Sequence, residues 1–587
     1  MSNKLEILFV DAYKEGRLLN EIYLQYLGKH GENDDIKTAL VSIHNAGLCN
    51  VIEAYTELKN NKESGVDFFL TRYVFEQSLP EMESEILPVM ECVLNLVEEA
   101  GADLAAGYPL SSFARYCEQD ERRPKEAVQI IEDCDNRYVG LLHIVLSSGS
   151  KFNSEYYLSK AIELASHQDI EIRKLAILSF RNLEYKGNNR RINNAFKCLQ
   201  ERLENESDDY LIAHLIRASF GLCKQSNFLI SHEVAILIDE AVKKGGKACI
   251  HAISEIFSTE HKNLPNEMLD VIKKHLLSID PKNKGTISLI DSGIAHLIES
   301  SEANKGIVFL ETILLENSNE ISMYDLSVTK SIISRNNKNL LDRLLTRWFL
   351  KSDWVLCDGI SVIINEIHGN EPELSIDPNE IPRRDFRHLY FLARKTFGYL
   401  FYKPITITSI IVSILRIARD KKTKMALSDF LYDPVMMNYT GSAQDYLKKC
   451  VYRENKVNRR YIEIALDKIK RYLKGLHSVG ELKELYPPQT HIDAYWRQYT
   501  QQMTRSIKDA EKKSVFANLF SKSVLLYGRK SIEYISDGNE MPKRMELPLQ
   551  SHSVTMEQPR LTTIDDNGLN ELIKHFRAER IINEANS

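Results

Sequence analysis

At 587 residues the chain exceeds the length over which one hydrophobic core normally grows, which excludes a single compact domain and favours several domains or an array of repeats. Hydrophobic residues make up 43% and charged residues 27%, as in ordinary folded proteins, while only 25 Gly and 16 Pro interrupt the chain, so we expect helix throughout. The small net charge of −6 conceals a strong asymmetry along the sequence.

The first region, residues 1–150, is predicted to be helical and acidic. Apolar residues recur at three-to-four spacing over 18–27 and again over 86–97, which is typical of one buried helix face. The region holds 26 Asp and Glu against 13 Lys and Arg, a net charge of −13. Such a local excess of one sign indicates an interaction with partners of the opposite sign.

A repeat is predicted over residues 151–367. Asp169 can cap a helix that continues with apolar residues at helical spacing. A shift of 39 residues superimposes two such stretches, with matches at Asp169 and Asp208, Ile172 and Leu211, Ala176 and Leu215, Ile177 and Ile216, and Leu183 and Leu222. Units of about 40 residues with two helices each are typical of α-solenoids. A non-repetitive helical bundle is the alternative.

The repeat resembles the HEAT-repeat family. Asp169 and Arg173, placed before Leu175-Ala176, match the Asp and Arg at the start of that family's second helix. The next unit departs from the pattern, because Ile212 stands where the Arg is expected. The resemblance covers about one third of the chain and implies a stacked helical scaffold that binds proteins or nucleic acids.

A turn-rich stretch over residues 367–382 predicts a domain boundary, and helices are expected again over 383–485. Residues 381–475 hold 21 Lys and Arg against 8 Asp and Glu, a net charge of +13. Aromatic residues are interleaved with the cations between 386 and 402. Cations neutralise phosphates and exposed rings can stack on unpaired bases, so nucleic acid is one predicted partner. An acidic protein surface and an ordinary solvated face are the alternatives.

The helix predicted over 459–476 places its aromatic residues on the apolar face and its cations on the other face, with Gly475 as the expected stop. Base stacking by this helix is therefore not expected. The cations proposed to meet an anionic partner are Arg383, Arg384, Arg387, Arg394, Lys395, Lys421, Lys422, Lys424, Arg460, Arg471 and Lys474.

A small α+β element is predicted over residues 523–587. Residues 531–535 are strand-like, 536–539 form a turn, 546–556 look extended, and a helix is expected over 568–585. An enzyme site in this element, with Arg529, Lys530 and Glu533 as polar candidates, is a third functional hypothesis.

Motifs for known chemistry are missing from the sequence. Gly245-Gly246-Lys247 lacks the upstream glycine and the following hydroxyl of a phosphate loop, and is expected to separate two helices. The nine cysteines include no Cys-x-x-Cys pair, and there is no His-Glu-x-x-His. We therefore expect no catalytic residues, no metal and no cofactor in this chain.

The chain start has no signal-peptide layout, and the most apolar run, residues 404–418, is too short to span a bilayer. A cytoplasmic location without membrane contact is expected. The sequence thus predicts a mainly α protein, a HEAT-like α-solenoid with a small C-terminal β element. Its predicted function is that of a non-enzymatic scaffold or adaptor that binds protein partners. A nucleic-acid-binding helical protein using residues 381–475 is the alternative.

Overall fold

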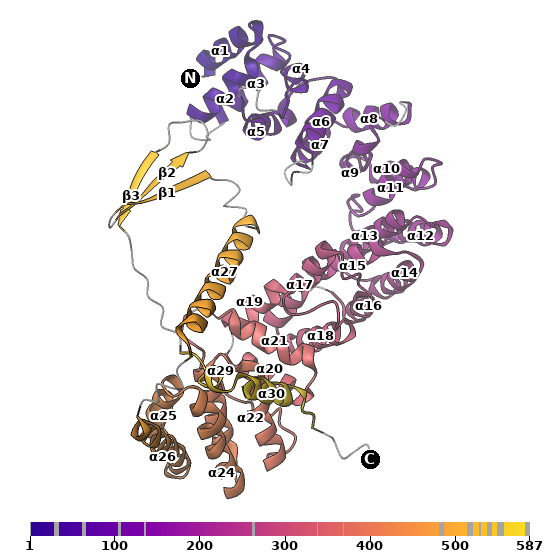
Figure 1. The fold of residues 1–587 in the computed structure, drawn as a ribbon. Coiled ribbons are helices and arrows are strands. Elements are labelled where there is room, and N and C mark those ends of the chain that lie inside the picture. Colours follow the sequence, from indigo (N-terminus) through magenta and orange to yellow (C-terminus); the bar gives the residue numbers. More distant parts are fainter. Residues whose placement is uncertain are drawn as a thin grey trace. The chain divides into compact units, whose positions relative to one another are not determined.

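The computed structural model describes residues 2–28, 34–60, 66–101, 103, 107–133, 137–260, 264–336, 338–367, 369–480, 487–513, 521–527, 530–536, 543–548 and 557–581, with the backbone alone over 510–548. These residues are mainly α-helical (Figure 1). The chain divides into two compact units, Met1–Ile332 and Ile333–Ser587.

The first unit is a succession of helices joined by short turns. They are α1 (Ser2–Lys14), α2 (Leu18–Gly28), α3 (Asp34–Asn45), α4 (Val51–Thr56), α5 (Phe68–Ser78), η2 (Leu79–Glu81), α6 (Ile86–Ala100), α7 (Tyr108–Cys117), α8 (Arg122–Asp133), η4 (Val139–Leu141), α9 (Leu142–Ser150), α10 (Ser154–Leu164), α11 (Ile170–Ser179), α12 (Asn189–Asn205), α13 (Asp209–Gln225), α14 (Ser231–Lys244), α15 (Lys247–Glu260), α16 (Asn266–Leu276), α17 (Lys284–Glu299) and α18 (Ala303–Glu316), and α19 (Ser327–Asn336) crosses the unit border. The helices predicted near 18–27 and 86–97 are confirmed as α2 and α6.

Helices of the first unit contact one another in two series. Helices α9, α11, α13, α15 and α17 each pack on the next member of that set, while α10 packs on α12 and α14 on α16 (Figure 1). Sequential neighbours such as α12 and α13 also pack together. Each helix therefore buries one face against its hairpin partner and another against the following hairpin.

Buried apolar side chains occupy the predicted repeat positions. Ala176 and Ile177 of α11 are fully buried, as are Leu215 and Ile216 of α13. Asp169 caps α11 by accepting from the amides of residues 171 and 172, and the side chain of Asp208 caps α13 in the same way. The 39-residue register read from the sequence therefore aligns equivalent caps and core positions in these two helices.

A second set of carboxylates caps helices across the hairpins. Asp209, at the start of α13, accepts hydrogen bonds from the amides of Gly246 (2.6 Å) and Ala248 (2.9 Å) at the start of α15. Asp291 of α17 accepts from the amides of Val328 and Thr329, both at 2.8 Å, at the start of α19. First-turn amides have no partner inside their own helix, so each carboxylate fixes one hairpin on the next.

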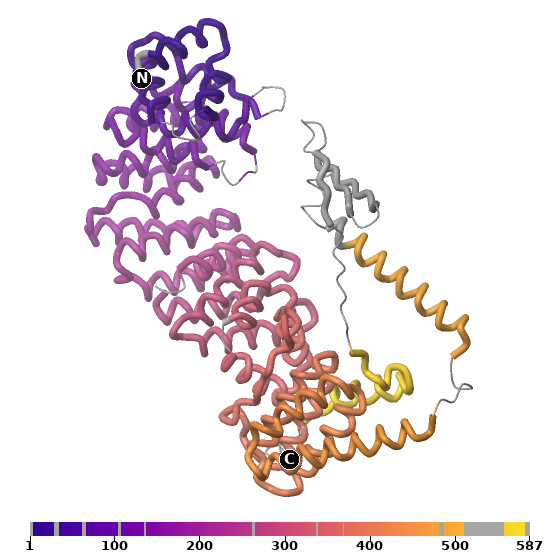
Figure 2. The backbone as a smooth tube through the Cα atoms, turned by 90° about the vertical axis from the view of Figure 1, so that its left-hand side faces the viewer, coloured from indigo at the N-terminus to yellow at the C-terminus, as the bar shows by residue number. Residues whose placement is uncertain are grey.

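The second unit contains α20 (Lys338–Lys351), α21 (Trp354–Asn365), α22 (Phe386–Leu400), α23 (Pro404–Ile417), α24 (Lys421–Phe430), η5 (Leu431–Met436), α25 (Ser442–Arg453), α26 (Lys456–Val479), α27 (Gln489–Lys513), α29 (Leu561–Ile564) and α30 (Asp566–Ala578). Helices α20, α22, α24 and α26 pack in one series, and α23 packs on α25 in another. Helix α30 packs on α22, and Figure 2 shows this C-terminal helix in yellow. The apolar run over 404–418 forms α23, a buried helix.

The turn-rich residues between α21 and α22 lie across two helices of the same unit. Ser375 donates its amide to Asp342 of α20 (2.8 Å), and the amides of Leu374 and Ile376 donate to serine hydroxyls of α23 (both 3.0 Å). Leu374 and Ile376 are buried. These residues are an ordered part of the second unit. The predicted division of the chain into domains 1–150, 151–367, 383–485 and 523–587 stays a prediction.

Three backbone strands, β1 (Ser521–Tyr527), β2 (Lys530–Ser536) and β3 (Lys543–Pro548), pair antiparallel in the order β1-β2-β3. The register sets Lys522 opposite Ile535 and Glu533 opposite Met545. The predicted turn at 537–539 and residue Arg529 lie outside the described residues, so the small α+β element stays a prediction. The helix expected over 568–585 is observed as α30, which ends earlier, at Ala578.

Two sequence expectations concern single residues. The expectation that Gly475 ends its helix is wrong, because α26 continues to Val479 and Gly480, with a φ of 74°, forms the C-cap. Eight of the nine cysteines are described, and all eight are free and buried, as expected of small core thiols. No helix in the described part of the chain combines the length and apolar character needed to cross a bilayer.

Candidate anion-binding surface

The predicted basic region contains three helix starts that lie side by side. Asp385, Asp420 and Asn455 are the N-caps of α22, α24 and α26, each 35 positions after the previous one. Each cap side chain accepts a hydrogen bond from an amide of its helix's first turn, at 2.9, 2.7 and 2.9 Å for the amides of residues 388, 423 and 458. Contacts join Phe386 to Lys422 and Tyr390 to Phe430, and Lys424 to Asn458 and Ser428 to Tyr461, so the three helices run in the same direction and their positive dipole ends point the same way.

Exposed cations gather around these three helix starts. We call this set the basic edge, and it consists of Arg383, Arg384, Arg387, Lys421, Lys422 and Arg460, all of which are exposed. Two contacts tie the starts together: the Lys422 ammonium lies 5.0 Å from the centre of the Phe386 ring, and Lys424 donates to the side chain of Asn458. The edge therefore presents ammonium and guanidinium groups from three successive helices.

Acceptors within the chain meet some cations of the basic edge: the Asp385 carboxylate attracts Arg383, and Arg384 donates to the backbone oxygen of Pro378 at 3.2 Å. The hydroxyl and amide of Thr423 donate to Asp420 and hold the pKa of that carboxyl below its usual value. Glu463 pairs with Arg459 at 2.9 Å. Part of the positive charge of the edge is thus balanced within the chain.

Three of the predicted cations serve internal contacts. Lys395 is fully buried and donates to the backbone oxygen of Arg577 at 2.6 Å, and burial lowers its pKa to about 8. Arg394 donates to Glu579 at 2.7 Å. Lys424 is buried against Asn458, and burial lowers the pKa of this lysine as well. These side chains are part of the folded core of the second unit.

The remaining two predicted cations, Arg471 and Lys474, are exposed on α26 but lie farther along it. A helix rises about 1.5 Å per residue, which places Arg471 about 16 Å from Arg460. The apolar face predicted for this helix is correct for Tyr461, Ile462 and Ile469, which are buried.

Most aromatic rings of the basic region are part of the core. Phe391, Phe397 and Phe401 are 2% exposed or less, and Tyr399 is 9% exposed. Phe386 and Tyr390 are half-buried, and their rings stack on each other 5.4 Å apart. Tyr402, 75% exposed, lies beyond the last turn of α22, at the end opposite the basic edge. The rings of α22 therefore give the edge no fully exposed aromatic face, whereas Tyr452, 85% exposed, stands three residues before the Asn455 cap.

Sequence reasoning missed Arg419, Lys456 and Arg459, which are also exposed at these helix starts. The recurrence of a capping Asp or Asn every 35 residues was the signal that could have found them. Counting charge over a long window located the region, whereas the cap spacing would have located the helix starts within it.

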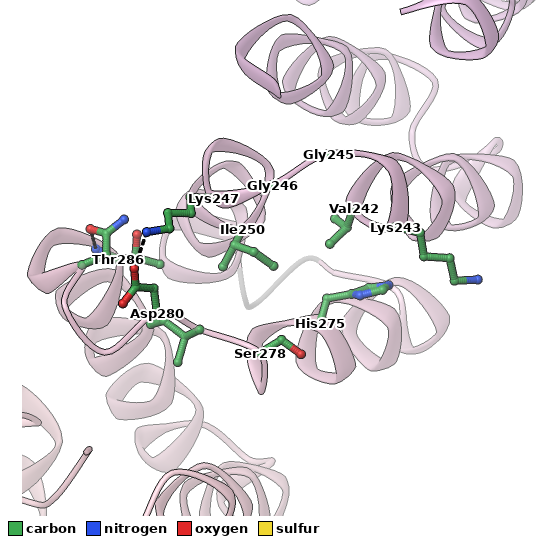
Figure 3. Close-up of a pocket in the computed structure, with 12 residues that line it drawn as sticks. Val242, Lys243, Gly245, Gly246, Lys247, Ile250, His275, Ser278, Asp280 and Thr286 are labelled. Carbon is green, nitrogen blue, oxygen red and sulfur yellow. Dashed lines mark hydrogen bonds and ion pairs between the residues drawn. The ribbon is translucent and has the colours of Figure 1, made fainter. Parts of the chain in front are cut away.

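A cavity of about 470 Å³ in the first unit surrounds the Gly245-Gly246-Lys247 run (Figure 3). The two glycines separate α14 from α15, as expected. Lys247 points toward Asp280 across the cavity, at 2.5 Å, and keeps the pKa of that carboxyl below its usual value. His275 bonds to Asp239 at 2.7 Å. Lys247 and His275 thus each have a carboxylate partner within the fold.

Among the described residues, no group of three or more His, Cys, Asp or Glu side chains is placed to hold a metal ion. The basic edge is therefore the arrangement in the described part of the chain that best fits recognition of an external ligand. No family model, curated protein or solved structure matches this chain.

Proposed function

We propose that this chain is a non-enzymatic helical-repeat scaffold, an α-solenoid of HEAT-like hairpins, that binds macromolecular partners. The observation that carries this proposal is the packing of alternate helices in series, α9 to α17 in the first unit and α20 to α26 in the second. Such packing builds a surface that grows with each hairpin and presents side chains at regular spacing.

The HEAT-like assignment is supported by the residues that suggested it. Asp169 caps α11, and Arg173 donates to the backbone oxygens of His167 (2.9 Å) and Gln168 (2.8 Å) in the turn before that helix. The two side chains thus fix the turn between α10 and α11. In the next hairpin Ile212 is fully buried, so this hairpin keeps the Asp cap without the arginine.

The partner of the basic edge is proposed to be an acidic protein surface. Carboxylates can pair with Arg383, Arg384 and Arg387 without any need for aromatic stacking, and the rings nearest these cations are buried or half-buried. Charge complementarity of this kind steers association and selects among partners.

Nucleic acid is the second candidate partner, favoured by the row of guanidinium and ammonium groups on successive helix starts. Contact would be made with backbone phosphates, and six such contacts would lower affinity by roughly a thousandfold between 50 and 200 mM salt. The third hypothesis, an enzyme site around Arg529, Lys530 and Glu533, stays a prediction because those side chains lie outside the described residues.

A cytoplasmic location is part of the proposal. It is supported by the eight described cysteines, which are free and buried as in proteins of reducing compartments.

The proposal is tested by affinity capture with the tagged full-length chain in its native cells. The test variant carries Arg383→Glu, Arg384→Glu and Arg387→Glu. The control carries the same charge change at three exposed cations of α25: Lys448→Glu, Lys449→Glu and Arg453→Glu. We expect protein partners that persist after nuclease treatment, are lost from the test variant and stay with the control.

Loss of all partners on nuclease treatment would favour nucleic acid. Identical partners on the test variant and on the control would contradict a role for the basic edge. Circular dichroism of both variants checks that the helices are intact.

A further inference from the structure

The last described segment, residues 557–581, packs back onto the second unit. We call it the tail, and it contains α29 and α30. Its contacts with the rest of the unit are made at two ends, one near the start of α25 and the other on α22. Residues 481–556 connect it to α26.

At its first end the tail supplies a cap that α25 lacks. Gly441 is the N-cap of α25 and has no side chain to accept a hydrogen bond. The carboxylate of Glu557 accepts from the amides of Gly441 (2.6 Å) and Ser442 (2.8 Å) and from the Ser442 hydroxyl. Next to it, Arg560 donates its amide to the backbone oxygen of Asn438 at 3.0 Å. A negative group at a helix start is favoured by both the free amides and the helix dipole.

At its second end the tail places the C-terminal end of α30, with its free backbone oxygens, against α22. Lys395, fully buried on α22, donates to the backbone oxygen of Arg577, and Arg577 Nε donates to the backbone oxygen of Gly398, both at 2.6 Å. Arg394 pairs with Glu579, whose backbone follows α30 directly. Cations at the last turn of a helix complement its free carbonyls and its dipole.

An aromatic anchor sits beside these polar contacts. The ring of Phe576 lies 6.0 Å from that of Phe397 and 5.9 Å from that of Phe430. Gly398 makes room for it, since a Cβ at this position would lie 3.2 Å from the Phe576 Cβ. The surface under α30 is therefore shaped for this segment, with a glycine, a buried lysine and an aromatic pocket in one place.

Three features of the tail favour its release as one piece. Among its described side chains only Pro559, Leu569 and Phe576 are buried. Helix α30 has its own cap, because Asp565 accepts from the amide of Gly568 at 2.9 Å. In sequence, residues 481–556, which include α27 and the three strands, separate the tail from α26, so α22, on which α30 packs, is not its sequence neighbour.

We propose that the tail is an exchangeable peptide ligand and that α22, the end of α24 and the residues from Asn438 to the start of α25 form a peptide-binding site for it. The site recognises an acidic residue ahead of a helix that carries a phenylalanine near its carbonyl end. The same segment of a second copy has this chemistry and can replace the tail in trans. The proposal is independent of the basic edge and of the partner proposed for it.

The test uses the full chain with a protease recognition sequence inserted after residue 551. After cleavage, we expect the C-terminal fragment to co-elute with the rest of the chain on size exclusion. We also expect it to be displaced by a labelled peptide of residues 557–581, with saturable binding measured by fluorescence anisotropy.

Substitutions are placed in the peptide, so the protein's own folding is unaffected. Phe576→Ala and Glu557→Gln peptides should each bind at least about tenfold more weakly, because one loses the buried ring and the other the charge at the helix start. A Lys574→Gln peptide is the matched control, since Lys574 is exposed and pairs within the tail with Glu571.

Two outcomes would overturn the proposal. A fragment that stays bound but never exchanges would make the tail a permanent part of the fold. A fragment that dissociates from a still-helical protein, with no binding of the labelled peptide, would show that the contacts hold only while the chain is continuous.

Discussion

Single carboxylates join helix starts to residues that lie far away in the sequence. Asp209, Glu371 and Glu557 each accept backbone amides at the start of a helix 34 or more positions away in sequence. A helix start offers several amides without internal partners, so one such carboxylate stabilises both its own position and the helix it caps. None of these contacts could be predicted from sequence, because the acceptor and its amides are far apart in the chain.

His214 of α13 is predicted to make the first unit sensitive to acid. Its Nδ1 atom is buried and has no hydrogen-bond partner among the described residues. Burial, with added repulsion from Arg217, Lys174 and Arg181 and an opposing attraction from Glu255, lowers its pKa to about 4. As the pH falls from about 6.5 to 4 the unfolded chain binds a proton at this site and the folded chain does not, so stability is lost over this window, by at most about 3 kcal/mol.

The measurement is the thermal midpoint of the first unit, followed by circular dichroism between pH 7 and pH 4, for the natural chain and for His214→Gln. Other acid effects are common to both chains. The stability difference should therefore shift in favour of the variant as the pH falls. Parallel pH curves for the two chains would show that His214 has no depressed pKa.

At the scale of elements, helices were predictable where they carry a local signal. Asp169 and Asp208 are caps read directly from the sequence, and the apolar spacing of α2 and α6 gave those helices. Gly475 was misassigned as a helix end, because α26 continues past it and ends at Gly480, where the backbone takes a positive φ.

Two helix-interior glycines are predicted to respond in opposite ways to alanine. A Cβ on Gly221 of α13 would lie 2.3 Å from the Arg181 Cβ and 2.7 Å from the Arg181 Cα, so the backbone itself must move. We expect Gly221→Ala to destabilise the first unit by about 1–3 kcal/mol. Gly475 of α26 has no atom within 4 Å of such a Cβ, and Gly475→Ala should stabilise by about 0.5–1 kcal/mol.

Urea unfolding of each variant, followed by circular dichroism, measures both changes. Gly475→Ala serves as the control for the intrinsic preference of alanine for helix. A stabilising effect of Gly221→Ala would contradict the close approach of α13 to the backbone after α11.

At the scale of the whole molecule, the sequence composition showed that acidic and basic residues are segregated along the chain. It did not show which charged side chains are accessible to a partner. The window over 381–475 located the basic region, and six of its eleven candidate cations lie at adjoining helix starts. The sequence could not show that Lys395 and Arg394 are unsuited to bind an external partner, because the tail residues that contact them lie more than 180 positions away. Burial of the aromatic rings depends in the same way on packing against Phe430 and Phe576.

The central claim is that successive helix starts of the second unit join their cations into one surface for an anionic partner. The most direct test is fluorescence anisotropy of labelled poly-L-glutamate with three full-length chains: the natural one, the Arg383, Arg384 and Arg387 charge-reversed variant, and the α25 charge-reversed control. The natural chain and the control should bind at 50 mM salt and weaken about tenfold or more at 200 mM, because exposed charges are screened, while the edge variant should not bind. Equal affinity of the edge variant and the α25 control would contradict the claim.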